Sequence, residues 1–207
     1  MTFIVGKLPQ TSVREAGRLL TRAFAADPVI THFLSGARRR QIAFPAFFRA
    51  IILENLEYGQ VFGSWDEGRL IGVAVWTPPD APGPSSVRRA KVNHAIVRGL
   101  FPRRSRGLYG GFDAMSSLHP TKPHWYLGFV GVEPNRQTQG IGRQLLAPVL
   151  EFADTSGVLC YLETPFPATH EFYRRLGFAL GIEARPFEGA PPIWTMVREP
   201  SEGRRGT

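Results

Sequence analysis

The stretch Trp125–Arg143, WYLGFVGVEPNRQTQGIGR, has three parts in a fixed order. It begins with a run of aromatic and branched residues, which is typical of a strand and is interrupted by two glycines. A polar connection containing Pro134 follows, and then Q-T-Q-G-I-G leads directly into the amphipathic run Ile141–Ala153. A strand, a short turn and a glycine-rich helix start point backbone N–H groups and the positive end of a helix dipole at one place. The stretch therefore predicts a phosphate-binding site.

The composition favours one packed globular domain. A chain of 207 residues with 43% hydrophobic and 12% aromatic residues is long and apolar enough to bury a core. No apolar run reaches the ~18 residues of a membrane span, and the N-terminus MTFIVGKLPQ lacks the pattern of a signal peptide. The single cysteine, Cys160, excludes an internal disulfide and lies in an apolar run typical of a buried strand. We therefore expect a cytoplasmic protein without a membrane partner.

The formal net charge of +8 is carried almost wholly by arginine. Such a balance favours an anionic partner, which is a nucleic acid, a membrane surface or a polyphosphorylated cofactor. The arginine clusters are dispersed and match no nucleic-acid-binding motif, so we interpret them mainly as solvated surface. We expect no nucleic-acid partner.

Hydrophobic periodicity predicts alternating strands and helices along most of the chain. Thr11 or Ser12 is a candidate cap for the first helix, Asp27-Pro28 is interpreted as its end, and the turn Asp66–Gly68 predicts a hairpin. The expected strands are 3–5, 59–64, 69–76, 125–132, 158–163, 178–187 and 193–198, and the expected helices are 13–24, 38–58, 139–156 and 168–176.

The middle of the chain is expected to be a variable insertion, residues 77–123. It contains the Pro/Gly/Ser-rich stretch TPPDAPGPSS, a basic helix from Ser86 to about Leu100, an irregular part and a short helix around Phe112–Leu118. We predict one domain over residues 1–198, with this insertion forming a wall for a second substrate, and a flexible tail over residues 199–207.

Three phosphate-binding patterns compete for QTQGIGR. A P-loop requires Gly-Lys followed by Ser or Thr, but Arg143 and Gln144 follow Gly142 here. A dinucleotide fingerprint requires a third glycine, and Leu145 stands at that position. The third pattern, Q/R-x-x-G-x-G/A, is filled by Gln137, Gly140 and Gly142. It resembles the acetyl-CoA loop of the GNAT superfamily of N-acetyltransferases.

A second motif strengthens this resemblance. Thr169–Phe178, THEFYRRLGF, resembles the N-x-x-F-Y-x-x-x-G-F signature of the same superfamily at the expected distance. Across residues 123–198 the chain looks most similar to the puromycin N-acetyltransferase-like branch, through HWYLGFVGVEP, GVLCYLET, FYRRLGF and P-x-x-W-T-M. Thr138 departs from this pattern by replacing a glycine, and Thr169 replaces the asparagine of the signature.

The resemblance implies a mixed α/β (α+β) GNAT fold, with a mostly antiparallel sheet splayed at its central strand and flanked by helices. Acetyl-CoA would be the co-substrate. Its pantetheine arm would lie along the central strand, where glycines suit a bulge and a close backbone approach, and its pyrophosphate on the glycine turn. The implied cofactor-binding residues are Phe129, Val130, Gly131, Val132, Gln137, Thr138, Gln139, Gly140, Ile141, Gly142, Arg143, Thr169 and Phe172.

The implied reaction is direct attack of an amine on the thioester, which needs a group to take the amine proton and a donor for the departing thiolate. Tyr173, at the tyrosine of the F-Y motif, is the predicted acid. Glu163, at the end of its strand, is ranked first as base, and Glu133 is the alternative. His124, expected just before the central strand, and His170, expected to face solvent, are weaker candidates. No residue cluster has metal-ligand spacing, so no metal is expected.

The leading hypothesis is therefore an acetyl-CoA-dependent N-acetyltransferase that acts on a primary amine of a small molecule, such as a xenobiotic or antibiotic. Two alternatives remain open, namely a protein or peptide N-acetyltransferase and a non-catalytic protein that binds acyl-CoA or nucleic acid. The sequence is compatible with a monomer or a homodimer.

Overall fold

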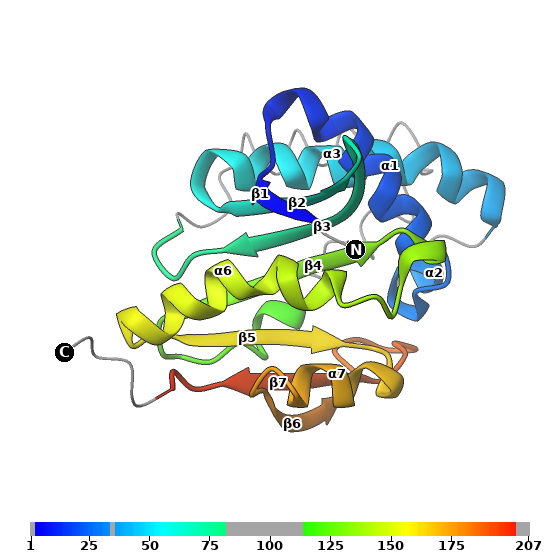
Figure 1. Cartoon of the computed structure of the whole chain (residues 1–207). Coiled ribbons are helices and arrows are strands. Elements are labelled where there is room, and N and C mark those ends of the chain that lie inside the picture. Colours follow the sequence, from blue (N-terminus) through cyan, green and yellow to red (C-terminus); the bar gives the residue numbers. More distant parts are fainter. Residues whose placement is uncertain (1–2, 34–35, 82–113, 202–207) are drawn as a thin grey trace.

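The computed structural model describes residues 3–33, 36–81 and 114–201, and within them seven strands form one sheet in the order β1-β2-β3-β4-β5-β7-β6 (Figure 1). All neighbouring pairs are antiparallel except β4 and β5. The strands are β1 (Ile4–Lys7), β2 (Gln60–Asp66), β3 (Arg69–Thr77), β4 (His124–Val132), β5 (Leu159–Thr164), β6 (Ala179–Ala184) and β7 (Ile193–Arg198). The helices are α1 (Val13–Ala23), α2 (Pro28–Phe33), α3 (Ala37–Tyr58), α6 (Ile141–Ser156) and α7 (His170–Arg174), with short 3-10 turns η1 (Gln10–Ser12), η2 (Pro134–Arg136) and η3 (Pro167–Thr169). The predicted mixed α/β class is confirmed.

The sheet opens at its central strand. β4 pairs with β5 at only three positions, from His124↔Leu159 to Tyr126↔Tyr161, and then departs from it. On its other side, β4 continues along β3, where Val75 pairs with Phe129 and Trp76 pairs with Leu127. Gly128 is therefore the extra residue of a β-bulge, which bends β4 away from β5. The predicted splay at the central strand is confirmed.

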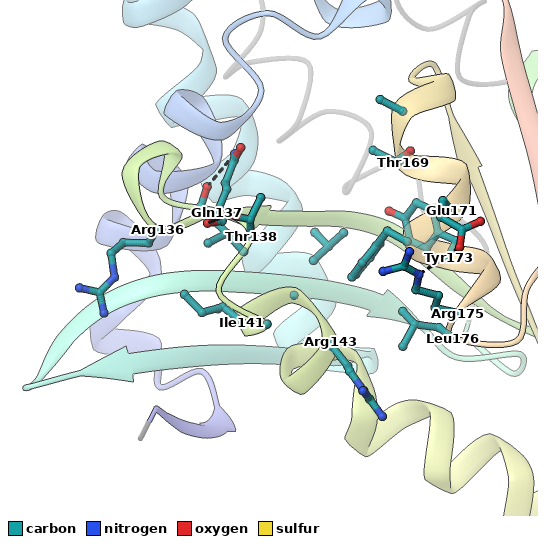
Figure 2. A pocket seen from close by; sticks show the side chains of 16 residues that line it. Arg136, Gln137, Thr138, Ile141, Arg143, Thr169, Glu171, Tyr173, Arg175 and Leu176 are labelled. Carbon is teal, nitrogen blue, oxygen red and sulfur yellow. Dashed lines mark hydrogen bonds and ion pairs between the residues drawn. The ribbon is translucent and has the colours of Figure 1, made fainter. Parts of the chain in front are cut away.

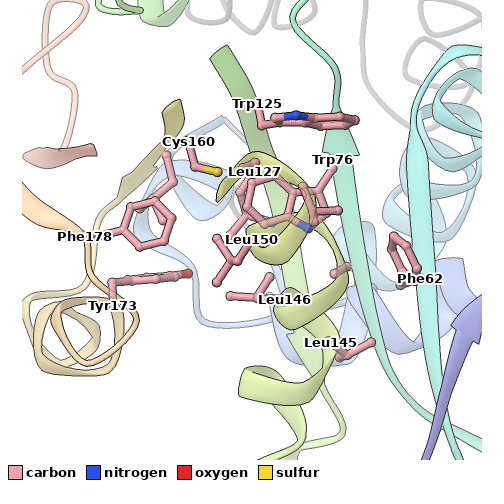
Figure 3. Close-up of a cluster of buried hydrophobic side chains, with 14 of the residues drawn as sticks. Phe62, Trp76, Trp125, Leu127, Leu145, Leu146, Leu150, Cys160, Tyr173 and Phe178 are labelled. Atoms are coloured by element: carbon pink, nitrogen blue, oxygen red, sulfur yellow. The ribbon is translucent and has the colours of Figure 1, made fainter. Parts of the chain in front are cut away.

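Each face of the sheet carries its own core. Successive side chains of β3 point to opposite faces, so Val73 and Val75 pack under α1 and α3, whereas Ala74 and Trp76 pack under α6. Figure 3 shows the second of these clusters, in which Trp76 lies beside Leu127 of β4 and the leucines of α6, and Cys160 of β5 lies on the other side of the cluster with Phe178 and Tyr173. Because α6 and α7 both pack into the second cluster, their first turns lie on the same side of β4, where the strand has separated from β5.

Two glycines allow α1 to pack closely against α3 and against β4. A Cβ at Gly17 of α1 would lie 2.9 Å from the carbonyl oxygen of Pro45 in α3. A Cβ at Gly131 of β4 would lie 2.8 Å from Cδ2 of Leu20 in α1. Gly131 was expected to permit a close backbone approach, and the group that approaches it is α1.

One boundary prediction was wrong. Asp27-Pro28 does not end α1, which stops at Ala23, but begins the separate helix α2. The Oδ1 atom of Asp27 accepts the N–H of Ile30 at 2.9 Å, and Pro28 occupies the first helical position, where its missing N–H costs nothing.

The ends of the C-terminal elements follow from glycine backbone angles. α6 begins at Ile141 rather than at Gln139 because Gly140 has a φ of +83° and forms the N-cap. Gly177 has a φ of +90°, which confirms the left-handed end predicted for the short helix. The β2–β3 hairpin is also confirmed, with φ values of 49° and 78° at Glu67 and Gly68.

Most of the predicted insertion lies outside the described residues, including the basic helix 86–100, and residues 114–116 are helical within the short helix expected at 112–118. Of the tail, Ser201 donates its N–H to Asp154 of α6 at 2.8 Å, and residues 202–207 lie outside the described part. None of the helices in residues 3–33, 36–81 and 114–201 is both long and apolar enough to cross a membrane.

Candidate active site

A cavity of about 720 Å³, here named the outer cavity, lies between the turn after β4, the first turn of α6 and α7 (Figure 2). Ten of the thirteen predicted cofactor-binding residues line it, namely Val130, Val132, Gln137, Thr138, Gly140, Ile141, Gly142, Arg143, Thr169 and Phe172. The structure thus brings the two sequence motifs to one cavity. Gln139 does not line it, and Phe129 and Gly131 line a second, smaller cavity instead.

The first turn of α6 offers unpaired backbone donors to the outer cavity. No side chain caps the helix, and its first internal hydrogen bond runs from the N–H of Gln144 to the carbonyl of Gly140. The amides of Ile141, Gly142 and Arg143 therefore precede the helical ladder and have no partner within it. Together with the helix dipole, they form a site suited to a phosphate group. This arrangement fits the pyrophosphate expected from the sequence.

The two glycines of the turn are needed for different physical reasons. A Cβ at Gly140 would meet no atom within 4 Å, so this glycine is required by its left-handed backbone and leaves the cavity open. A Cβ at Gly142 would lie 3.2 Å from Cζ of Phe172 in α7. The glycine turn and the F-Y motif, which the sequence presents as separate signals, are therefore packed against each other.

Thr138 has a φ of 64°, in the left-handed region that a β-branched residue rarely adopts. Its Oγ1 donates to the carbonyl of Gln137 at 2.6 Å. The departure of Thr138 from the glycine pattern thus places local backbone strain in the turn that faces the outer cavity.

The cations around the outer cavity are not equivalent. Arg136 forms an ion pair with Asp66, and Nε of Arg175 lies 3.0 Å from Glu171. Among the described carboxylates, none pairs with Arg143, which extends from the first turn of α6. Arg143 is thus the cation of this cavity that has charge left for an anionic ligand.

A second cavity of about 320 Å³, here named the inner cavity, lies where β4 separates from β5. Its wall comes from the end of α1, the start of α2, the outer half of β4, the end of β5 and α7. Val130, Val132, Gln137, Thr169 and Tyr173 line both cavities, so the two spaces adjoin. Phe129 packs its ring against Phe24 and Phe48, which leaves mainly its backbone toward the inner cavity.

Tyr173 stands at the junction of the inner and outer cavities. The residue is 8% exposed, and burial raises the pKa of its phenol well above the ordinary value. The hydroxyl therefore stays protonated through the working pH range and can donate a hydrogen bond. Tyr173 is the acid predicted from the sequence, and its raised pKa makes hydrogen-bond donation a better description of its role than complete proton transfer.

Glu163 lines the inner cavity from the end of β5, and its side chain is 3% exposed. Nε2 of His119 lies 3.3 Å from its Oε1 atom. That contact is within ion-pair distance but lacks hydrogen-bond alignment, so Oε1 has no hydrogen bond within the described part of the chain. A buried carboxylate oxygen without a full partner can still accept a hydrogen bond from a ligand in the inner cavity.

The alternative bases are placed differently. Glu133, expected near the splay, instead pairs with Arg22 of α1 and faces a separate cavity, because α1 crosses the end of β4 there. His170, expected to face solvent, packs its ring 5.2 Å from that of Trp194. Both expectations were wrong. His124 is the first residue of β4.

Thr169 has its hydroxyl engaged within the chain. Its Oγ1 donates to the carbonyl of Phe166 at 2.8 Å and lies 2.9 Å from Oγ1 of Thr164. The hydroxyl proton is therefore unavailable for a ligand, so this threonine does not offer the cavity the amide donor of the asparagine that it replaces.

Two residues of the site were missed by sequence reasoning. Asp27 lines the inner cavity at 5% exposure, and burial raises the pKa of its carboxyl to about 6. Its Asp-Pro pattern signalled a helix boundary but not a cavity. His119 meets Glu163 only through the fold, so no local pattern could have found it. In the described ranges, no group of three His, Cys, Asp or Glu could hold a metal ion.

Comparison with known proteins assigns the chain to a family. The model of the Acetyltransferase (GNAT) family matches residues 30–178. An uncharacterized N-acetyltransferase of Schizosaccharomyces pombe is 32% identical over 206 residues, which cover 90% of this chain and 79% of that protein. The N-alpha-acetyltransferase RimI of Mycobacterium tuberculosis is 34% identical over 99 residues, covering 46% of this chain and 63%, less than two thirds, of that protein.

Solved structures agree on the fold. A histone acetyltransferase HPA2 and related acetyltransferase from Corynebacterium glutamicum superposes with a TM-score of 0.67 at 22% identity, covering 99% of both chains. A Drosophila melanogaster polyamine N-acetyltransferase superposes with a TM-score of 0.65 at 16% identity, covering 96% of this chain and 100% of that one. At these identities the likeness concerns the fold alone.

Proposed function

Because the chain belongs to the GNAT family of acetyltransferases, we propose that it transfers the acetyl group of acetyl-CoA to the primary amine of a small, positively charged molecule. The observation that carries this proposal is the position of Tyr173, which lines both the outer and the inner cavity. A group at that junction can reach the thioester of a donor in the outer cavity, where the C–S bond breaks as an amine in the inner cavity forms the new C–N bond.

The outer cavity is the proposed donor site. Acetyl-CoA supplies an acetyl thioester together with a pyrophosphate. The amides of Ile141, Gly142 and Arg143 would hold the pyrophosphate, with Arg143 adding a positive charge. The backbone of Val130 and Val132, which β5 leaves unpaired on one side, would hold the pantetheine arm as an added strand.

The inner cavity is the proposed acceptor site. Glu163 takes the proton of the acceptor ammonium, so that the neutral nitrogen can attack the thioester carbonyl. Tyr173 donates a hydrogen bond to the sulfur as negative charge develops there. Direct transfer is favoured over a cysteine-bound acetyl group, because the sole cysteine, Cys160, is fully buried and burial raises the pKa of its thiol to about 12.

The charge and size of the inner cavity support a small cationic acceptor. Asp27 and Glu163 bring two carboxylates to a volume of about 320 Å³, which is at the low end of small-molecule sites. An acceptor that enters as an ammonium ion would be attracted by both groups. The likeness to the puromycin N-acetyltransferase-like branch agrees with a small xenobiotic amine.

A peptide N-terminus is the second candidate acceptor, and the observation that favours it is the likeness to an N-alpha-acetyltransferase over 99 residues. A terminal ammonium would use the same Glu163. The two candidates differ in the size of the group attached to the amine. A peptide acceptor must also fit part of its backbone, and the small inner cavity leaves little room for it.

The test is a thiol-release assay with purified protein and acetyl-CoA. The acceptors are a panel of diamines, arylalkylamines and aminonucleosides, compared with short peptides that have free N-termini. We expect turnover with one class of small amines, and we expect Tyr173→Phe to reduce kcat while calorimetry shows unchanged CoA affinity. Turnover only with peptides would transfer the proposal to the second candidate. Tight CoA binding without turnover of any amine would leave a non-catalytic acyl-CoA-binding protein.

A further inference from the structure

His119 is held rigidly beside the inner cavity by the segment that leads into β4. Its ring lies 4.5 Å from that of Tyr126 on β4 and 4.7 Å from that of Tyr161 on β5. The hydroxyl of Tyr161 also donates to the carbonyl of Leu118 at 3.2 Å, which ties this segment to β5. The orientation of the imidazole is thus set by two strands.

A chain of hydrogen bonds places a proton on Nδ1 of His119. Nδ1 of His124 lies 2.8 Å from the carbonyl oxygen of Lys122, which can only accept, so this nitrogen carries the proton. Burial lowers the pKa of His124, which favours its neutral form and leaves Nε2 as an acceptor. Nδ1 of His119 lies 3.1 Å from that Nε2 atom and therefore donates to it.

The remaining nitrogen of His119 then faces the inner cavity's carboxylate. With its proton on Nδ1, neutral His119 has a lone pair on Nε2, which lies 3.3 Å from Oε1 of Glu163. We propose that His119 receives from Glu163 the proton that the acceptor amine loses, and that His124 sets the tautomer which makes this possible. The inference rests on the proposed acetyl transfer and deepens it, because it adds a second proton carrier.

Two protons leave the acceptor nitrogen over one turnover. The first breaks its N–H bond to the ammonium nitrogen as an O–H bond forms on Glu163, and it then moves to Nε2 of His119 to give an imidazolium ion. The second leaves the nitrogen after the C–N bond has formed and is taken up by the departing thiolate, which is released as the thiol. The side chain of His119 is 22% exposed, so it can release the proton to water and return to its neutral form. Glu163 is left as a carboxylate for the next acceptor.

The other groups that face the pair do not compete for this proton. They are the phenols of Tyr126 on β4 and Tyr161 on β5, and the imidazole of His124 on β4. Burial raises the pKa of both phenols, so they remain protonated and act as donors. His124 already uses its only proton on Lys122.

The test compares His119→Phe, which keeps a stacking ring but removes both nitrogens, with wild type and with Glu163→Gln. We expect the kcat of His119→Phe to fall about 10- to 100-fold with KM changed less than about threefold, and the pH profile of kcat to change shape. His119→Phe added to Glu163→Gln should cause no further loss, because the two groups act in one path. Additive losses would indicate a structural role and overturn the proposal. His170→Gln, whose ring packs on Trp194 outside both cavities, is the matched control.

An independent measurement does not rely on turnover. Nitrogen chemical shifts from NMR of the whole protein should show neutral His119 as the Nδ1–H tautomer, and Glu163→Gln should shift its Nε2 resonance. An Nε2–H tautomer would overturn the relay whatever the enzyme acetylates. If the expected tautomer is found but no amine is turned over, the proposed function has failed and the hydrogen-bond chain stands as described.

Discussion

The outer cavity takes most of its wall from one continuous segment, residues 130–143, whereas the inner cavity collects side chains from α1, α2, β4, β5 and α7. The outer cavity presents backbone amides of α6 and the open edge of β4. The inner cavity presents the carboxylates of Asp27 and Glu163, and His119 contacts the carboxylate of Glu163.

The difference teaches how the two halves of the site respond to sequence change. Backbone donors need only the right φ angles and glycines at close contacts, so most side chains of the outer cavity can vary without loss of its donors. A carboxylate acts through its own charge and position, so we expect turnover to tolerate substitution less in the inner cavity than in the outer one. Substitutions should therefore separate donor affinity from turnover.

Glu163→Gln is expected to have the largest effect, and to change the chemistry of the inner cavity without changing the outer cavity. Removing the base should lower kcat about 10²- to 10⁴-fold, because the acceptor then lacks a group that takes its proton. The affinity for CoA, measured by calorimetry, should stay within about threefold. Glu183→Gln, on the exposed strand β6, is the matched control and should behave as wild type. A parallel loss of CoA affinity would break the distinction between the two cavities.

Asp27→Asn should change stability with pH. In the folded chain the pKa of Asp27 is raised from 3.8 to about 6, so its contribution to stability is present below the unfolded value and is lost as the pH rises through about 6. The full shift corresponds to about 3 kcal/mol. The asparagine side chain can still cap Ile30 but does not titrate. The Asp27→Asn variant should therefore gain stability over wild type between pH 4 and pH 8, as measured by urea unfolding, and parallel curves would contradict the burial argument.

Gly140→Ala and Gly157→Ala form a matched pair at the two ends of α6. Both glycines have a left-handed φ, 83° and 69°, and a Cβ at either would meet no atom within 4 Å. Each substitution should cost about 1 kcal/mol of folding free energy. Only Gly140→Ala should also weaken CoA binding, by about tenfold, because its methyl group enters the outer cavity. Equal CoA affinities of the two variants would show that the N-terminal end of α6 does not bind the phosphate.

Thr138→Gly is expected to have the smallest effect, and its sign is the informative part. It should raise the free energy of unfolding by about 0.5–1 kcal/mol, because glycine adopts the left-handed φ of 64° without strain. Glu67→Gly, at the other positive-φ residue that is not glycine, is the control and should gain less, since glutamate is not β-branched. CoA affinity should change less than threefold. Destabilisation would show that the threonine side chain contributes contacts that outweigh its strain.

The sequence signals that point to the outer cavity are local. Gln137, Gly140 and Gly142 all lie in the short connection between β4 and α6 or in the first turn of α6. Most of the residues that line the outer cavity are these three and their near neighbours in sequence. The boundary at Asp27-Pro28 was misassigned because the same dipeptide can end one helix or cap the next, and only the hydrogen bond to Ile30 distinguishes them. Glu133 was misplaced because its partner, Arg22, lies on α1 at the far end of the sequence.

By itself the sequence determined the mixed α/β class and the family resemblance, and it predicted the segment that we propose binds acetyl-CoA, because periodicity, turns and glycine spacing are properties of short stretches of chain. Only the tertiary structure decided which carboxylates line the inner cavity and that His119 stands behind Glu163. The contact between His119 and Glu163 joins β5 to the segment before β4, which is distant in sequence. Its geometry depends on how β4 bends away from β5 at Gly128. A bulge of one residue thus opens the space in which the side chains meet.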